Sequence, residues 1–157
     1  MESLVKHPKV HEGYLNQQAL ILLHQNRARE TVPMLNKSLQ MAPAYWKTLT
    51  YLGVTFKELG QHDKADNYLK HGLLASKKSP LPLFYLIDNA MASGNKVNAQ
   101  DYTARLLAAF SVEMVQSFLK ELRHDNQIPP ISYTAISLSI KKHILEIDGN
   151  LPDFDYE

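Results

Sequence analysis

Histidines and carboxylates near the two ends of the chain are the residues whose spacing could support chemistry. His7 and His11 lie four residues apart and are followed by Glu12, an arrangement that resembles a pair of metal ligands. Pro8, between the two histidines, disfavours the helix that would bring both imidazoles to one side, and no third ligand follows nearby. We therefore interpret this stretch as a solvated N-terminal segment rather than a metal site.

The other candidates for catalysis are dispersed. Asp153 and Asp155 form an acidic pair, but they belong to a short acidic tail that cannot hold two carboxyl groups in a fixed geometry. The sequence has no glycine-rich phosphate loop and no nucleophile elbow. We expect the remaining histidines to be surface or groove residues: His24, His62, His71, His124 and His143. The sequence therefore predicts a protein that is not an enzyme and that needs no cofactor and no metal.

The composition narrows the class of protein further. The chain has 157 residues, enough for one domain with its own core. Its 17 basic and 16 acidic residues give a net charge of +1, which argues against a domain built mainly to hold nucleic acid. The absence of cysteine excludes a disulfide framework. No apolar run reaches the roughly 18 residues of a membrane span, and no apolar signal core is present, so we expect a cytoplasmic protein without membrane insertion.

Apolar stripes with helical spacing recur along the chain at a fixed interval of 34 residues. Three sets of equivalent positions show this interval: Leu15, Leu49 and Leu83; Leu22, Phe56 and Ala90; Asn26, Gly60 and Gly94. The residues of the last set are expected to end the first helix of each unit, because Asn and Gly accept the left-handed conformation of a helix stop.

A 34-residue period with two helices in each unit resembles the tetratricopeptide-repeat family. The middle unit carries the best match, Leu49-x2-Leu52-Gly53-x2-Phe56 followed by Ala65-x3-Leu69. The resemblance implies an all-α fold, a right-handed superhelical solenoid of antiparallel helix pairs, with repeats at 12–45, 46–79 and 80–113. Segment 1–11 precedes this domain.

Glycine and proline inside the predicted helices add two expectations. Gly53 and Gly72 each cost about 1 kcal/mol relative to alanine, and the resemblance places both where small residues let two helices cross closely. Pro33 lies inside the predicted second helix of the first unit. That helix either begins late, with Thr31 as its cap, or is kinked at the proline.

The last third of the chain predicts a divergent hairpin at 114–147 that covers the end of the stack. Its first helix has one apolar face, formed by Val115, Phe118, Leu119 and Leu122. A stiff loop, Gln127-Ile-Pro-Pro-Ile131, leads to a helix that Ser132 caps and Gly149 stops. The apolar residues of this second helix are Ile136, Ile140, Ile144 and Ile147. The acidic tail at 148–157 completes the chain.

The family resemblance implies a concave groove lined by the first helices, and hence binding of a peptide segment from a protein partner. The groove residues by register are Asn16, Leu20, His24, Lys47, Thr50, Tyr51, Val54, Lys57, Leu81, Phe84, Tyr85 and Asp88. Leu20, Val54 and Phe84 could equally be interhelical packing. The predicted function is an adaptor, scaffold or small chaperone, and the alternative is a substrate-recruiting domain of a larger enzyme such as a transferase.

Contacts between copies of the chain are a further possibility. The terminal hairpins could stack between chains, which would give a homo-oligomer. The tail alternates Leu151, Phe154 and Tyr156 with acids, so it resembles a short peptide ligand that could reach a groove and place its acids near Lys47 or Lys57. A solubilising end is the simpler interpretation of the same residues.

Overall fold

The structure is a computed structural model that describes residues 12–76 and 78–149. These residues form eight α-helices and one 3-10 helix and contain no strand, so the predicted all-α class is confirmed. The helices in chain order are α2 (Glu12–His24), η1 (Ala28–Glu30), α3 (Thr31–Met41), α4 (Trp46–Glu58), α5 (His62–Ala75), α6 (Leu81–Ser93), α7 (Lys96–Ala109), α8 (Val112–Arg123) and α9 (Tyr133–Asp148).

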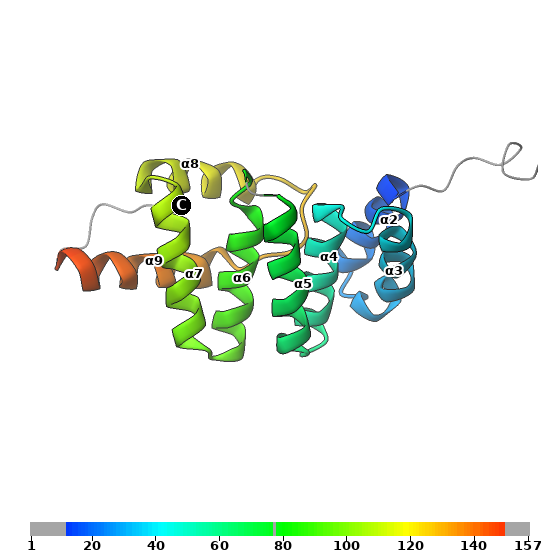
Figure 1. The fold of residues 1–157 in the computed structure, drawn as a ribbon, viewed down its shortest axis with the longest axis horizontal. Helices are drawn as coiled ribbons and strands as arrows, with labels where there is room; N and C mark the ends of the chain where they lie inside the picture. Colours follow the sequence, from blue (N-terminus) through cyan, green and yellow to red (C-terminus); the bar gives the residue numbers. More distant parts are fainter. Residues whose placement is uncertain (1–11, 77, 150–157) are drawn as a thin grey trace, which may run out of the picture.

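Six of these helices form three hairpins that lie side by side in a row, α2/α3, α4/α5 and α6/α7 (Figure 1). Each hairpin packs on the next, because α3 contacts α4 and α5 contacts α6. The first helices of the three hairpins also contact one another in order, α2 with α4 and α4 with α6. We call the side of the molecule that α2, α4 and α6 form the first-helix face.

The predicted helix stops are confirmed. Asn26, Gly60 and Gly94 have backbone φ angles of 60°, 78° and 76°, so all three adopt the left-handed conformation after the first helix of a hairpin. Asn26 is the only one of the three that is not glycine, and asparagine adopts this conformation more readily than most residues with a side chain. A fixed stop at each equivalent position gives the three hairpins the same turn.

The helix that contains Pro33 begins late, as one of the two alternatives predicted. The 3-10 helix η1 precedes it, and α3 starts at Thr31, so the proline occupies the first turn, where no helical N–H is lost. Thr31 does not serve as the N-cap. Its hydroxyl instead donates to the carbonyl of Ala28 at 2.7 Å and lies 2.8 Å from the hydroxyl of Thr55 on α4.

Gly53 and Gly72 lie where α4 and α5 cross, as the resemblance implied. A methyl group at Gly53 would lie 2.4 Å from Cγ of Leu69, and one at Gly72 would lie 3.0 Å from Oγ1 of Thr50. Leu69 and Thr50 are themselves fully buried, so neither has free space to move into. The two glycines therefore let the helices of the middle hairpin approach each other closely.

The C-terminal helices do not form the predicted hairpin at 114–147. Helix α8 has the expected buried residues Val115 and Leu119, and Ser132 caps α9 by accepting a hydrogen bond from the backbone N–H of Ala135. Helix α9, however, packs against α6 and α7, and it runs crosswise to them (Figure 1). The physical reason is the path of the connection between α8 and α9, which carries the chain across the first-helix face instead of turning it back.

The far end of α9 differs from its start. Ile136, Ile140 and Ile144 are buried, but Ile147 is 67% exposed, which corrects its expected place on the core side of the helix.

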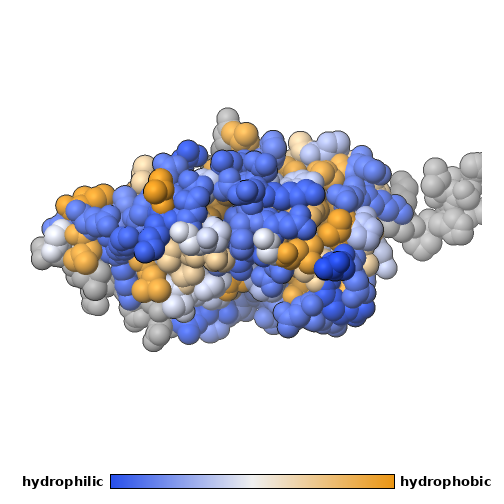
Figure 2. Space-filling model, turned by 90° about the horizontal axis from the view of Figure 1, so that it is seen from below, coloured by the Kyte–Doolittle hydropathy of each residue, from blue (hydrophilic) through white to orange (hydrophobic). Residues whose placement is uncertain are grey.

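Figure 2 shows a largely hydrophilic surface with separate hydrophobic patches, one of them at the α9 end of the molecule. Among the described helices, none combines the length and the apolar character that a membrane span requires.

Candidate functional site

The connection between α8 and α9 lies across the first-helix face. It leaves α8 after Arg123, passes α4 and α6, and enters α9 at Tyr133 (Figure 1). Residues 127–131, which we call the crossing segment, contain the sequence Gln-Ile-Pro-Pro-Ile. The surface predicted to hold a peptide is therefore covered by a segment of the same chain.

Three side chains of the first-helix face contact three consecutive main-chain carbonyls of the crossing segment. Tyr51 on α4 donates its phenol to the carbonyl of Gln127 at 3.4 Å. His24 at the end of α2 places Nε2 2.8 Å from the carbonyl of Ile128. Tyr85 on α6 donates its phenol to the carbonyl of Pro129. Each hairpin thus contributes one side chain, and each contact is made with the backbone of the segment.

The sequence of the crossing segment explains why it is not helical: Gln127 lies in a turn, Ile128 in a bend, and residues 129–131 have no regular secondary structure. Pro129 and Pro130 have no N–H to donate and favour the polyproline conformation, and a proline also disfavours helix in the residue before it. The backbone N–H of Gln127 is satisfied locally by the carboxylate of Asp125 at 2.8 Å. The carbonyls that this conformation leaves without local partners are those that the three side chains bind.

Apolar side chains of the crossing segment point into the protein. Ile128 is 9% exposed and Pro129 is buried. Ile131 is partly buried and packs against the large core cluster that includes Phe84, Tyr85 and Ile140. The segment is therefore held by its carbonyls and by two isoleucines, one on each side of the proline pair.

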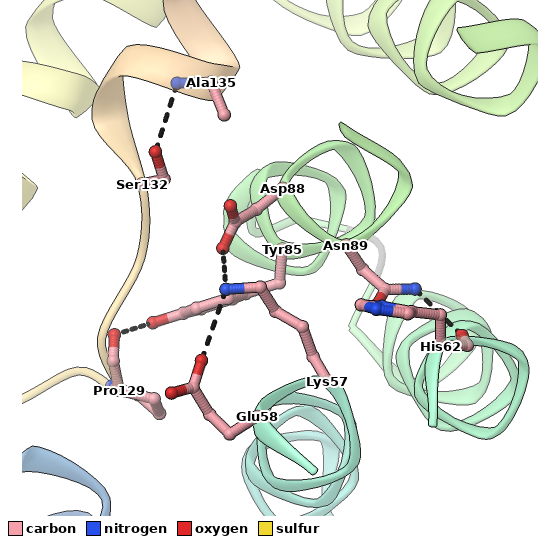
Figure 3. Close-up of polar contacts among 9 residues, drawn as sticks. All are labelled: Lys57, Glu58, His62, Tyr85, Asp88, Asn89, Pro129, Ser132 and Ala135. Carbon is pink, nitrogen blue, oxygen red and sulfur yellow. Dashed lines mark hydrogen bonds and ion pairs between the residues drawn. The ribbon is translucent and has the colours of Figure 1, made fainter. Parts of the chain in front are cut away.

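An ion pair lies beside the crossing segment, between α4 and α6. Nζ of Lys57 is 3.1 Å from Oδ2 of Asp88 and 3.3 Å from Oε2 of Glu58 (Figure 3). Burial raises the pKa of the Asp88 carboxyl, against the opposite effects of Lys57 and the backbone N–H of Ser132. Burial lowers the pKa of Lys57, but the carboxylates of Asp88 and Glu58 outweigh it and raise the pKa overall. Lys57 is thus protonated and committed to an internal partner.

The two tyrosines that hold the crossing segment remain neutral over a wide pH range. Burial, with smaller contributions from Tyr45 and Asp125, raises the pKa of Tyr51 to about 12. Burial also raises the pKa of Tyr85 well above its usual value. A phenol must keep its proton to donate it, so these shifts preserve both donors at neutral pH.

An open groove remains next to the crossing segment, between α4, α6 and α8. Its volume is about 330 Å³, and Ile128 of the segment forms part of its wall. Apolar side chains dominate the lining, with Lys47 on α4 and Glu121 and Asp125 at and after the end of α8. The apolar lining residues are Trp46, Tyr51, Pro80, Leu81, Phe118, Leu122 and Ile128. Such a groove fits one bulky apolar side chain with charged neighbours.

Comparison with protein-family models, with curated proteins and with solved structures finds no match for this chain.

The structure brings most of the predicted groove residues to one region. His24, Tyr51 and Tyr85 hold the crossing segment, Lys57 and Asp88 form the ion pair beside it, and Lys47, Tyr51 and Leu81 line the open groove. Leu20, Val54 and Phe84 are buried in the core clusters, which agrees with the alternative interpretation of these residues as interhelical packing.

Two predicted groove residues lie elsewhere. Asn16 is buried between α2, α3 and α4, where its amide donates to Thr48 at 3.0 Å and accepts from Ser38 at 3.1 Å. Thr50 faces Gly72 of α5, and its hydroxyl donates to the carbonyl of Trp46 at 2.8 Å. Register errors of this kind arise because neighbouring positions on a helix differ by about 100° in direction.

Sequence reasoning missed one wall of the open groove. Phe118 and Leu122 of α8 face α4 and α6 across it, although they were expected to cover the end of a stack. Trp46, the single tryptophan of the chain, was also not selected. Its place next to Lys47 in the sequence was a usable signal, since an aromatic residue beside a cation is common at binding surfaces. In the structure Trp46 is half-buried, and Nζ of Lys47 lies 5.9 Å from the indole ring.

The possible metal ligands and the tail lie mostly outside the described residues. His7, His11 and the acidic pair Asp153 and Asp155 belong to these parts of the chain, as do Leu151, Phe154 and Tyr156 of the tail hypothesis. Within 12–76 and 78–149, no three His, Cys, Asp or Glu side chains gather closely enough to hold a metal ion. His62 is engaged between helices, with Nδ1 2.9 Å from the side-chain oxygen of Asn89 (Figure 3).

Proposed function

We propose that this chain is a non-catalytic protein-interaction module built from tetratricopeptide-like repeats, and that it binds a peptide segment of a partner protein in the groove between α4, α6 and α8. Three helical hairpins at a 34-residue interval, each with a left-handed stop at the equivalent residue, support the repeat class. An adaptor or scaffold is the role that suits such a module.

The observation that carries the proposal is the groove itself. Trp46, Phe118 and Leu122 present apolar surface in a cavity of about 330 Å³ whose walls come from three different helices. An apolar anchor residue in a preformed cavity typically provides most of the binding energy of a peptide. Lys47 on one side and Glu121 on the other would orient the charged residues that flank this anchor.

The polar groups nearby support binding rather than catalysis. The groups with raised pKa values, Tyr51, Tyr85 and Asp88, already have internal partners that fix the structure. Their polar groups hold the crossing segment and the contact between α4 and α6, which supports binding at the groove rather than proton transfer to a substrate. The groove therefore offers shape and apolar surface.

A peptide library displayed on phage and selected on the whole protein tests the proposal. We expect the selected peptides to share one bulky apolar residue and to bind Leu122→Lys at least tenfold more weakly, because a charge would enter the apolar cavity. Lys47→Glu should weaken those peptides that carry an acid next to the anchor. Leu138→Lys, at a 56% exposed position of α9, is the matched control and should bind all of them normally.

The same variants apply to natural partners. A protein captured from cells by the wild-type chain should be lost by Leu122→Lys and kept by Leu138→Lys. Selected peptides or partners that bind these two variants equally well would place the binding surface elsewhere and contradict the proposal.

A further inference from the structure

The crossing segment has the form of a bound peptide ligand. It contains neither helix nor strand, three consecutive carbonyls accept hydrogen bonds from three different helices, and its apolar side chains enter the protein on both sides of a proline pair. Recognition by aromatic and polar side chains of an extended, proline-containing backbone is one of the common ways in which proteins bind peptides. Here the peptide and the receptor belong to one chain.

The contacts are of a kind that another peptide could make. Tyr51, His24 and Tyr85 each bind a backbone carbonyl, which every residue possesses, so these contacts do not require the particular side chains of the segment. What the site does require is a backbone without competing N–H groups at the position of Pro129 and Pro130. It also requires an aliphatic side chain at the place of Ile128 and another at the place of Ile131.

We infer that the first-helix face is a second peptide-binding site, adjacent to the open groove, and that residues 127–131 occupy it as an internal ligand. The external ligand is a peptide with two adjacent prolines between aliphatic residues. It binds when the crossing segment leaves the face. Because the segment is tethered between α8 and α9, its effective concentration is on the order of millimolar, and it competes strongly with any ligand in solution.

This inference goes beyond the proposed function. The two sites share Tyr51 and Ile128, but each has residues of its own. The open groove depends on Phe118 and Leu122 of α8, whereas the first-helix face depends on Tyr85 and His24. One can therefore fail while the other holds. Leu122→Lys should leave binding at the first-helix face unchanged.

The direct test uses the segment itself as the probe. A fluorescent peptide of residues 124–133, His-Asp-Asn-Gln-Ile-Pro-Pro-Ile-Ser-Tyr, is titrated against the whole protein and against the double variant Ile128→Ser with Ile131→Ser, with anisotropy as the readout. The double variant weakens the internal ligand and keeps every receptor side chain. We expect it to bind the peptide at least tenfold more tightly than the wild-type chain does.

Two control peptides distinguish specific binding from nonspecific binding. A peptide with alanine in place of both prolines, and one with serine in place of both isoleucines, should bind the double variant at least tenfold more weakly than the parent peptide. Circular dichroism of the double variant should match that of the wild type. A folded double variant that binds no peptide, or binds all three equally, overturns the inference.

A second measurement covers the case in which the double variant does not fold. The sequence has no cysteine, so Ile128→Cys introduces a single thiol. Ile128 is 9% exposed in the wild-type protein. We expect the parent peptide, at saturating concentration, to accelerate labelling of this thiol at least fivefold, because it displaces the segment. The alanine peptide should not. A labelling rate that the parent peptide leaves unchanged also overturns the inference.

Discussion

The phenol of Tyr85 on α6 donates a hydrogen bond to the carbonyl of Pro129, a residue 44 positions further along the chain. Both residues are buried, so this bond joins the middle of the helix row to the connection that leads into the last helix. It is one of three contacts, with those of His24 and Tyr51, that hold the crossing segment on the first-helix face, the surface that the sequence predicted to bind a peptide. The hydrogen bonds that stabilise the fold here are therefore the same ones that cover the candidate binding surface.

Replacing Tyr85 with phenylalanine should destabilise the protein by about 1–3 kcal/mol, because the buried carbonyl of Pro129 would lose its donor without access to water. Tyr51→Phe should cost less, under about 1 kcal/mol, since its bond to Gln127 is 3.4 Å long. Urea unfolding measures both. Tyr14→Phe, at a position that is 51% exposed, is the control and should stay within about 0.5 kcal/mol of the wild type. Equal values for Tyr85→Phe and Tyr14→Phe would contradict the assigned role of Tyr85.

The ion pair of Lys57 and Asp88 predicts that replacing Lys57 destabilises the protein by an amount that depends on pH. Lys57→Met should cost about 3–5 kcal/mol at pH 7, because it leaves the Asp88 carboxylate buried without its cation. Burial already raises the pKa of Asp88, and loss of Lys57 raises it further. A carboxyl whose pKa is higher in the folded state than in the unfolded state makes the folded state more stable as pH falls. The loss in free energy of unfolding of Lys57→Met relative to the wild type should therefore shrink from pH 7 to pH 5.

The control for this pair is a surface pair of the same kind. Lys70→Met removes the partner of Asp66 at an exposed position of α5, where Nζ and the carboxylate are 2.9 Å apart. It should cost no more than about 1 kcal/mol, because water screens the pair. A Lys57→Met deficit that stays constant from pH 7 to pH 5 would show that Asp88 is not the group left uncompensated.

The local features of this fold were predictable, and the path of the crossing segment was not. The helix stops at Asn26, Gly60 and Gly94 follow from the conformational freedom of single residues, and Ser132 as a cap follows from its own side chain. The crossing segment is held through main-chain carbonyls, which no residue type marks. Its prolines predicted a stiff loop but could not indicate which surface the loop would cross.

The same reason explains which site residues were found. His24, Tyr51 and Tyr85 were selected because the register of the first helices points them to one face, and the structure brings all three to one segment. The wall that α8 contributes to the open groove was missed, because its position depends on where the chain goes after α7. Non-local contacts of this kind leave no periodic signal in a sequence.

The packing of α9 gives a prediction that separates the observed arrangement from a terminal hairpin. Ile140 is fully buried where α9 packs, and Ile147 is 67% exposed, although both lie on the stripe expected to be apolar. Ile140→Ala should cost about 2–5 kcal/mol, and Ile147→Ala should stay within about 0.5 kcal/mol of the wild type. Thermal or urea unfolding measures the pair. A large loss at Ile147 would mean that the end of α9 is covered in solution.

The crossing of α4 and α5 predicts that the effect of Gly53→Ala on stability depends on one neighbouring side chain, that of Leu69. Gly53→Ala would gain about 1 kcal/mol from helix propensity, but its methyl group would lie 2.4 Å from Cγ of the buried Leu69. Overpacking should outweigh the gain and leave a net loss of about 1–2 kcal/mol, and the larger Gly53→Leu should unfold or distort the middle hairpin.

In a Leu69→Ala background the two closest atoms are gone, and the carbonyl oxygen of Ala65, 3.3 Å away, is the close neighbour that stays. Gly53→Ala should then become stabilising, by up to about 1 kcal/mol relative to Leu69→Ala alone. Urea unfolding of the four proteins of this cycle measures the reversal. The test is specific because Leu69→Ala removes only the side chain that a methyl group at Gly53 meets most closely. If Gly53→Ala has the same effect in both backgrounds, close approach of these helices is not the reason for glycine at position 53.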